Sequence, residues 1–234
     1  MGVDGVLVSF GARLSERANR AALAFSAAVS EAGLHGVAEV ATSLASVYLR
    51  LDLGQTEQEK ISAPLRALLG ARDWFQADLP LGRRLWRVPA VFGTEIAPQL
   101  DEAAALAGLT PAEAVAEICS APLRVQTIGF ARGQPYLGEL PPHWDIPRQT
   151  GLSPQVPEGA LAVAIRQMVL FSVNTPTGWR HLGQTAVRLF RPDAPEPFLL
   201  RPGDDVLFQP VTRAELENIR ARDPQGGAIA ERVG

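Results

Sequence analysis

The N-terminal part of the chain alternates between the periodicity of a strand and that of a helix. Val6, Val8 and Phe10 occupy every second position, which predicts a short strand. Apolar residues then recur at three- and four-residue spacing, and this helical pattern lies between Ser15, a suitable N-cap, and Gly33, a suitable C-cap. The chain is therefore predicted to open with a strand and an amphipathic helix.

Two further strands and a second helix are predicted to follow. Residues 37–40 and 47–51 carry alternating apolar side chains and are separated by small residues that suit a turn. Thr56 and Glu59 form the pattern of a capping box before a segment with apolar residues on one side. The order β-α-β-β-α packs two helices on one face of a small antiparallel sheet, so we predict a ferredoxin-like domain over residues 1–84 of an α+β protein.

A second domain, residues 85–234, is predicted after the Gly-Arg-Arg sequence at 82–84, which interrupts the apolar pattern. It begins with a strand at 85–92 and two short helices at 98–107 and 111–118. Beyond them, prolines or glycines recur roughly every 8 to 12 residues, which predicts a closed or nearly closed β-barrel. Its candidate strands are 124–130, 160–165, 169–173, 186–190 and 206–211. The polar tail after Ala214 is expected to fray or to form a loose helix.

Composition and charge narrow the class of protein. The chain has 47% hydrophobic and 20% charged residues, as soluble globular proteins do, and lacks an apolar run of the roughly 18 residues that a membrane span needs. The N-terminus lacks the basic flank and long apolar core of a signal peptide, so we expect a cytoplasmic protein. The single Cys119 excludes an internal disulfide framework. A net charge of −3 gives no long-range attraction to nucleic acid or to an acidic membrane, and we expect neither as a partner.

Motifs of the familiar enzyme classes are absent from the sequence. It has no glycine-rich phosphate loop with its lysine, no His-Glu-x-x-His pair and no Gly-x-Ser-x-Gly elbow. His35, His143 and His181 lie far apart along the chain, so no metal site is predicted. Cys119 ends an apolar helix and fits a buried, inert thiol better than a nucleophile. Residues 201–204, Arg-Pro-Gly-Asp, are predicted to form a turn, which explains Asp204 and Asp205 better than a catalytic carboxylate pair does.

Two glycine-rich blocks are the candidates for a ligand site: GFARGQPYLGEL at 129–140 and TPTGWRHLGQTAVRLF at 175–190. Tyr136 and Trp179 follow proline or glycine in these loops, where a large ring is either a lid on the barrel or a platform for a ligand. Arg132 and Arg148 carry the forked donors that bind a carboxylate or a phosphate, although arginines on loops are more often simply solvated.

Several segments of the chain, in matching order and spacing, resemble one protein family. These segments are RVPAVFG at 87, PQLDEAAALAGLTPAEAVAEICSA at 98, IGFARGQPYLGEL at 128, IPRQT at 146, VPEGALAVA at 156, TGWRHLGQTAVRLF at 177 and RPGDDVLFQPV at 201. The chain resembles the family of the B-type subunit of 5-oxoprolinase, also known as allophanate hydrolase subunit 1, which includes the Kip-type histidine-kinase inhibitors and belongs to the carboxyltransferase domain, subdomains C and D. The resemblance implies that the predicted barrel is cyclophilin-like.

This resemblance also implies partners and a reaction. A member of the family is a non-autonomous subunit that pairs with the C-type subunit, an allophanate hydrolase subunit 2-like barrel protein, and works with the A-type subunit. Together they use ATP, with Mg, to open the lactam 5-oxoproline to glutamate, and no tightly bound cofactor is expected on this chain. The catalytic residues stay unknown. From the two loop blocks and one matching glutamine, the substrate-binding candidates are Phe130, Arg132, Tyr136, Gln167, Gly178, Trp179 and Arg188.

Departures from the family pattern leave the function open. The chain has RGQPY at 132–136 where the family usually has PGFPY, and QMVLFS at 167–172 where it has QTGIYP. Met and Val in place of Thr and Gly remove a hydrogen-bonding group and block a close backbone approach. We therefore interpret the chain as a divergent member: an enzyme subunit for a lactam or related amide, or a non-catalytic binding and regulatory module of the Kip type. A stand-alone cyclophilin-like peptide binder is a weaker third interpretation.

Overall fold

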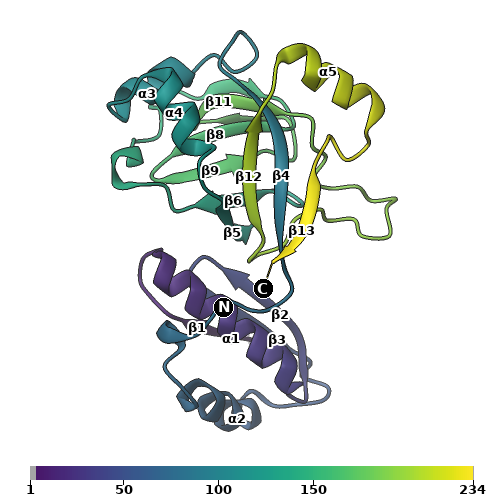
Figure 1. Cartoon of the computed structure of the whole chain (residues 1–234). Coiled ribbons are helices and arrows are strands. Elements are labelled where there is room, and N and C mark those ends of the chain that lie inside the picture. The colour runs from purple at the N-terminus through teal and green to yellow at the C-terminus, as the bar shows by residue number, and fades with distance from the viewer. Residues whose placement is uncertain (1–3, 234) are drawn as a thin grey trace. The chain divides into compact units, whose positions relative to one another are not determined.

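A computed structural model describes residues 4–233 and shows two compact units (Figure 1). The first unit runs to Leu81 and the second begins at Gly82. Residues 1–3 and 234, the outer ends of the two predicted domains, lie outside the described residues.

The N-terminal unit has the predicted order of elements. They are β1 (Gly5–Ser9), α1 (Glu16–Ala32), β2 (Val37–Ser43), β3 (Ser46–Leu51), α2 (Gln58–Gly70) and the 3₁₀ turn η1 (Trp74–Gln76). β3 lies between β1 and β2 and is antiparallel to both. The β-α-β-β-α order is confirmed, whereas the ferredoxin-like assignment of this unit stays a prediction.

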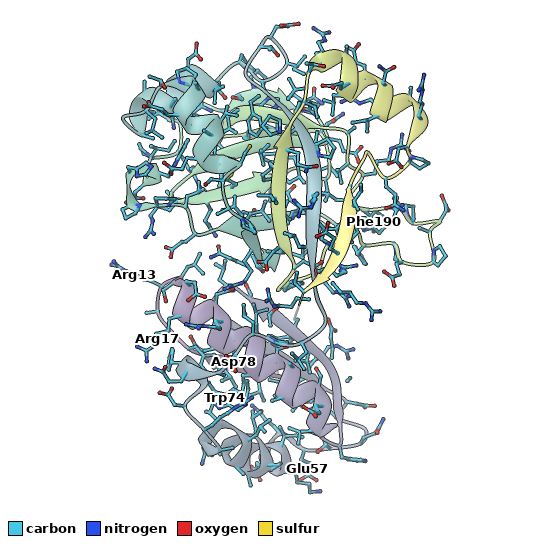
Figure 2. All side chains as sticks on the ribbon, viewed as in Figure 1. Arg13, Arg17, Glu57, Trp74, Asp78 and Phe190 are labelled. Carbon is cyan, nitrogen blue, oxygen red and sulfur yellow. The ribbon has the colours of Figure 1, made fainter. Side chains whose placement is uncertain are left out.

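Local capping explains one helix of this unit and corrects the other. Ser15 accepts a hydrogen bond from the backbone of the first turn of α1, and Gly33 ends the helix with a φ of +55°, as predicted. The predicted capping box at Thr56 is wrong, because α2 begins one residue later, after an N-cap without a side-chain hydrogen bond. Thr56 instead packs against Gly36. A Cβ added to Gly36 would lie only 2.4 Å from the Cβ of Thr56. The core of the unit includes an edge-to-face pair of Phe25 and Trp74, the latter labelled in Figure 2.

The second unit is a closed barrel with short helices. Its elements are β4 (Arg83–Phe92), α3 (Leu100–Leu106), α4 (Pro111–Ile118), β5 (Leu123–Ile128), β6 (Pro135–Gly138), the 3₁₀ turn η2 (Pro142–Trp144), β7 (Ser153–Val156), β8 (Ala160–Ala164), β9 (Gln167–Leu170), β10 (Thr175–Thr177), β11 (Arg180–Thr185), β12 (Asp205–Pro210), α5 (Arg213–Arg222) and β13 (Ile229–Val233). The hydrogen-bonded order is β11-β8-β9-β6-β5-β12-β4, and β11 pairs again with β4 to close seven strands into a barrel. The barrel predicted from turns is confirmed and is consistent with the cyclophilin-like class.

Two predictions for this unit are wrong. The predicted strand at 186–190 does not form, because the backbone at Ala186 is covered by the C-terminal segment. The strand in this part of the chain is β11, which ends at Thr185. A Cβ on Gly226 would lie 2.3 Å from the Ala186 carbonyl. The tail neither frays nor forms a loose helix: α5 has a capping box between Thr212 and Glu215, and β13 pairs with β4 (Figure 1).

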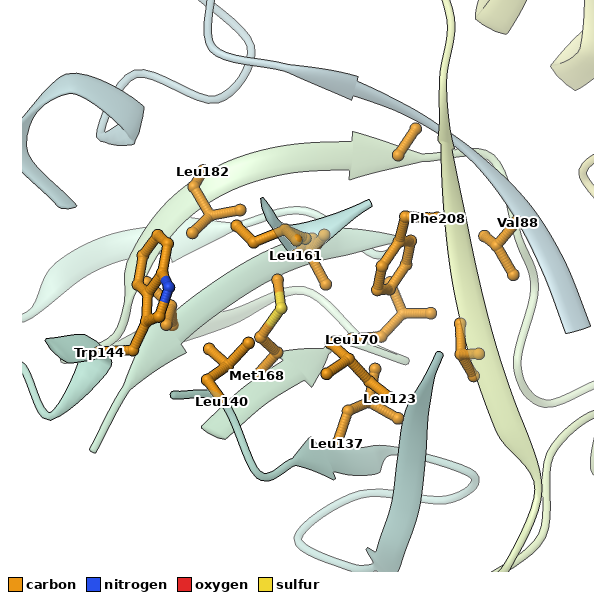
Figure 3. Close-up of a cluster of buried hydrophobic side chains, with 14 of the residues drawn as sticks. Val88, Leu123, Leu137, Leu140, Trp144, Leu161, Met168, Leu170, Leu182 and Phe208 are labelled. Carbon is orange, nitrogen blue, oxygen red and sulfur yellow. The ribbon is translucent and has the colours of Figure 1, made fainter. Parts of the chain in front are cut away.

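The barrel interior is filled by side chains. Figure 3 shows Trp144 and Phe208 on opposite sides of this core with Met168 between them, and each is almost fully buried. The Trp144 indole N–H donates to the Glu117 carboxylate at 2.8 Å, which satisfies the one polar atom of that side chain. Because the interior is a packed core, ligand sites of this unit have to lie on its outer surface.

A buried carboxylate anchors the turn before β12. Asp204 is 1% exposed and accepts hydrogen bonds from the Arg84 guanidinium at 2.5 Å, the Trp86 indole at 3.2 Å and the Arg201 backbone at 3.1 Å. The predicted turn at 201–204 is confirmed by the bond from the Asp204 backbone N–H to the Arg201 carbonyl. The carboxylate thus ties β4 to the turn that precedes β12.

Candidate ligand-binding groove

A groove of about 260 Å³ on the outside of the barrel gathers residues from both glycine-rich blocks. We call it the aromatic groove. Its lining consists of Phe130, Gln134, Tyr136, Arg148, Gln149, Leu152, Val169, Phe171, Pro176, Thr177, Gly178 and Trp179.

The strand pattern explains why this face can hold large rings. In β8, Leu161 and Val163 belong to the barrel core, whereas the alternate residues are alanines that belong to a separate cluster on the outer face. That outer cluster also includes Phe171 and Trp179, with Tyr136 packed against it. Small side chains in the strand therefore leave room for aromatic rings above it.

The rings and one guanidinium group form a contacting set. The centroids of Tyr136 and Trp179 are 6.0 Å apart with an edge-to-face angle of 68°. The guanidinium carbon of Arg148 lies 5.3 Å from the Trp179 ring centroid, within cation–π distance. Phe130 is 75% exposed and has a φ of +69°, which is unusual for a residue with a side chain. An exposed ring held in a sparsely populated backbone conformation is typical of a ligand-contacting loop.

Hydrogen bonds hold the Gly178–Trp179 corner in place. The Gln149 backbone N–H donates to the Gly178 carbonyl at 2.7 Å, and its side-chain amide donates to the Trp179 carbonyl at 3.1 Å. The side-chain oxygen of Gln149 in turn accepts from Gln99 at 2.7 Å. The backbone N–H of Trp179 donates to the Thr177 hydroxyl at 3.1 Å. Trp179 therefore belongs to a preformed wall rather than to a free lid.

Gln134 is a groove residue that sequence reasoning missed. It is 1% exposed, and among residues 4–233 its side-chain oxygen has no hydrogen-bond partner. A buried acceptor without a donor is costly, and a ligand N–H that reached the groove would satisfy it. The sequence did carry a signal, because Gln134 lies within the candidate glycine-rich block at 129–140.

The structure brings four of the seven predicted residues into the groove and places three elsewhere. Phe130, Tyr136, Gly178 and Trp179 line it, as does Arg148, for which solvation had been the favoured interpretation. The three others lie outside its lining. The guanidinium carbon of Arg132 lies 5.6 Å from the centroid of the Phe190 ring, and the buried Gln167 side chain donates to that of Gln126 at 2.9 Å. Arg188 lines a different cavity.

Burial and local contacts account for the cysteine and two of the histidines considered in the sequence. Burial raises the pKa of the half-buried Cys119 thiol to about 11, so it is a poor nucleophile at neutral pH. Burial also lowers the pKa of His181, whose ring nitrogen lies 2.9 Å from the Gly183 carbonyl, while His143 contacts the Glu117 carboxylate at 2.9 Å.

Within residues 4–233, no three His, Cys, Asp or Glu side chains are grouped as a metal site. None of the helices that the structure describes combines the length and apolar character that crossing a bilayer requires.

The closed barrel, with an aromatic groove on its outer face, and the separate small α/β unit define a two-unit barrel protein. Comparison with known families gives the particular class. The family model described as "Carboxyltransferase domain, subdomain C and D" matches residues 1–200, and the chain belongs to this family.

Individual relatives agree with this assignment. The chain is 28% identical to the B-type subunit of 5-oxoprolinase from Bacillus subtilis over 224 residues, which cover 92% of both chains. It is 38% identical to the B-type subunit of 5-oxoprolinase from Escherichia coli O157:H7 over 127 residues, or 54% of this chain and 58% of the relative.

Solved structures show the same fold. The crystal structure of TTHA0988 superimposes with a TM-score of 0.72 at 33% identity, over 89% of this chain and 40% of TTHA0988, so the chain spans about two fifths of that protein's length. The urea amidolyase of K. lactis matches 97% of this chain and 16% of its own with a TM-score of 0.73. At 19% identity, the urea amidolyase match shows the fold alone.

Proposed function

We propose that this chain is the B-type subunit of an ATP-dependent amidohydrolase complex, and that its aromatic groove holds a lactam or related amide. The supporting observation is a likeness over 92% of both chains to a protein named as the B-type subunit of 5-oxoprolinase, together with a groove built from the family's own motif segments. The name of that relative supports further subunits as partners, for which homologues of the C-type and A-type subunits are the candidates.

The lining of the groove suits a small planar amide. A lactam ring is flat enough to stack on the partly buried Tyr136 ring or the exposed Phe130 ring, and its N–H would satisfy the oxygen of Gln134 once that buried side chain turns towards the groove. The exposed guanidinium of Arg148 would donate to the lactam oxygen or to a neighbouring carboxylate. The chain's own residues would thereby bind and orient the amide.

ATP would enter this reaction as a second substrate. Transfer of its γ-phosphoryl group to the amide oxygen releases ADP and makes the carbonyl carbon open to attack by water. The C–N bond then breaks to give an amine and an acyl phosphate, and a second water hydrolyses the acyl phosphate to a carboxylate and inorganic phosphate. On this proposal the present chain positions the amide, and the partner subunits complete the site for phosphoryl transfer.

The departures at 167–172 favour a substrate that is more apolar than 5-oxoproline. Met168 and Leu170 lie in the barrel core, so these two differences alter packing rather than the groove. Val169 and Phe171 do line the groove, at positions where the family has glycine and tyrosine. They remove a phenol hydroxyl and add apolar surface, which favours a substrate with an apolar substituent next to its amide.

A co-expression experiment tests the proposal. The chain is purified with its C-type partner homologue, and ATP hydrolysis is measured with 5-oxoproline and with a panel of substituted lactams and amides, with and without the A-type homologue. At least one amide should stimulate turnover. Arg148→Ala and Gln134→Leu should each raise its half-saturating concentration roughly tenfold, because each removes a hydrogen-bonding partner. Arg132→Ala is the matched control: it removes the same charge from an exposed loop position outside the groove.

A different result would favour the Kip-type binding module. If the complex is stable but no amide stimulates ATP hydrolysis, the enzyme proposal fails. A regulatory module would instead retain a specific protein partner in pull-down experiments and lose it when Trp179 or Phe130 is replaced, because these rings would then form the docking surface.

A further inference from the structure

A second cavity, of about 470 Å³, lies in the barrel unit between α5 and the segment that follows β11. We call it the arginine cavity, because Arg188, Arg213 and Arg220 all line it. It is larger than the aromatic groove and shares no lining residue with it. One wall is α5, which lies beyond the residues that the family model matches.

The wall formed by α5 is held firmly against the barrel. Leu216 on the inner side of α5 is 1% exposed, and the capping box at Thr212 and Glu215 satisfies the first turn. After the helix, Gly226 has a φ of +67° and its backbone touches that of Ala186. The cavity is therefore preformed, so a ligand would not have to order the helix on binding.

The arginines differ in how far protein groups already satisfy them. Arg213 forms an ion pair with Glu217 at 2.9 Å and another with Glu95. Arg220 only donates a long hydrogen bond, 3.4 Å, to the Thr185 carbonyl, and Arg188 is exposed. Among residues 4–233 neither Arg188 nor Arg220 forms an ion pair with a carboxylate.

The charges that face the cavity leave it cationic. Arg213 is paired with Glu217 and with Glu95, which lies outside the lining, so the remaining lining groups are two guanidiniums against the single carboxylate of Glu158. The side-chain amide of Gln184 donates to the Glu158 carbonyl at 2.8 Å and holds that loop in place. Val187 and Leu216 supply apolar surface in the same lining. Such a lining suits a small organic anion with an apolar portion.

We propose that the arginine cavity binds a small organic anion through a phosphate or carboxylate group, with Arg188 and Arg220 as its donors. The forked guanidinium groups match the oxygens of either anion, and each charge-assisted hydrogen bond is stronger than a neutral one. The apolar part of the ligand lies against Val187 and Leu216. This site goes beyond the proposed amide-binding function and does not depend on it.

Isothermal titration calorimetry on the isolated full chain tests the site without any catalytic readout. Inorganic phosphate, ADP and glutamate are the probes, and at least one should bind with an affinity that falls as salt rises. Arg188→Ala and Arg220→Ala should each weaken binding at least roughly fivefold. Glu158→Gln should strengthen it roughly two- to fivefold, because it removes the opposing charge. Arg66→Ala, on the exposed face of α2 in the N-terminal unit, is the control for loss of charge and should leave binding unchanged.

Some outcomes of this experiment identify the anionic group that the cavity binds, and others refute the proposal. If phosphate and ADP bind but glutamate does not, the site recognises a phosphate group. If glutamate binds but phosphate and ADP do not, the site recognises a carboxylate. No binding of any probe at millimolar concentration overturns the proposal. Equal weakening by Arg66→Ala and Arg188→Ala also overturns it, because the attraction would then come from overall charge. Since Arg188 is an exposed loop residue, its variant should fold normally, and the thermal unfolding curve verifies this.

Discussion

Replacing Asp204 by alanine should destabilise the barrel unit strongly. Asp204 is fully buried and its carboxylate accepts hydrogen bonds from Arg84, Trp86 and Arg201. Its removal leaves the Arg84 guanidinium, whose side chain is 15% exposed, without its main counter-ion. The Trp86 indole N–H also loses its acceptor in a buried position.

The structure sets the size of the effect. Breaking a buried ion pair by removing one partner costs about 3–5 kcal/mol, and a buried donor left without an acceptor costs about 1–3 kcal/mol. Arg84 keeps a 3.0 Å hydrogen bond to the Leu199 carbonyl and a distant contact, 3.9 Å, with the exposed Glu196. These partial replacements place the expected loss of unfolding free energy near the lower end, at about 3 kcal/mol.

Urea unfolding followed by tryptophan fluorescence measures this loss. Three of the four tryptophans, Trp86, Trp144 and Trp179, lie in the barrel unit. With a slope of about 1–3 kcal/mol per molar urea, the midpoint should fall by about 1–3 M. Asp193→Ala, which removes an exposed loop carboxylate, should leave the midpoint unchanged within error.

A double variant isolates the cause and can refute the reasoning. In an Arg84→Met background there is no stranded cation, so the added cost of Asp204→Ala should fall to roughly half or less. If Asp204→Ala costs under about 1 kcal/mol, or costs the same with and without Arg84, then the buried ion pair is not what holds this turn.

Two further predictions concern the C-terminal segment and the cysteine. Gly226→Ala should cost at least about 2 kcal/mol more unfolding free energy than Gly108→Ala, because both have positive φ but only a Cβ at 226 would meet backbone atoms, at 2.3 Å. Equal melting temperatures for the two variants would refute the contact with Ala186. The raised pKa of Cys119, about 11, means that the thiol stays protonated at neutral pH; alkylation should be slow at pH 7 and should accelerate as the pH approaches 11. A rate that instead levels off near about pH 10 would show an ordinary exposed thiol, whose pKa is about 8.5.

Local features of the chain were predicted well where their partners are a few residues away. The helix at 111–118 has the predicted bounds because Thr110 and Glu113 satisfy its first turn between themselves. The first helix ends at Gly33 because glycine, which has no Cβ, readily adopts the αL conformation that ends a helix. Thr56 shows the limit of such reasoning: its capping pattern is present in the sequence, but contact with Gly36 determined its role.

The candidate site was predictable only in part, for a similar reason. The loop blocks indicated Phe130, Tyr136 and Trp179, because large rings among glycines stand out in the sequence itself. The roles of Gln134 and Arg148 depend on which segments meet across the outer face of the barrel, and no local pattern encodes that meeting.

The sequence by itself determined the element order of the N-terminal unit, the presence of a barrel, the family and the two loops that carry the aromatic groove. These properties follow from periodicity, turn residues and motifs that are contiguous along the chain. Only the tertiary structure decided that Gln167 pairs with Gln126, that Arg188 faces a second cavity, and that the C-terminal segment covers the backbone after β11. The physical reason is that strand pairing, burial and cavity walls are contacts between residues distant in sequence, whose free energy depends on how the whole barrel closes.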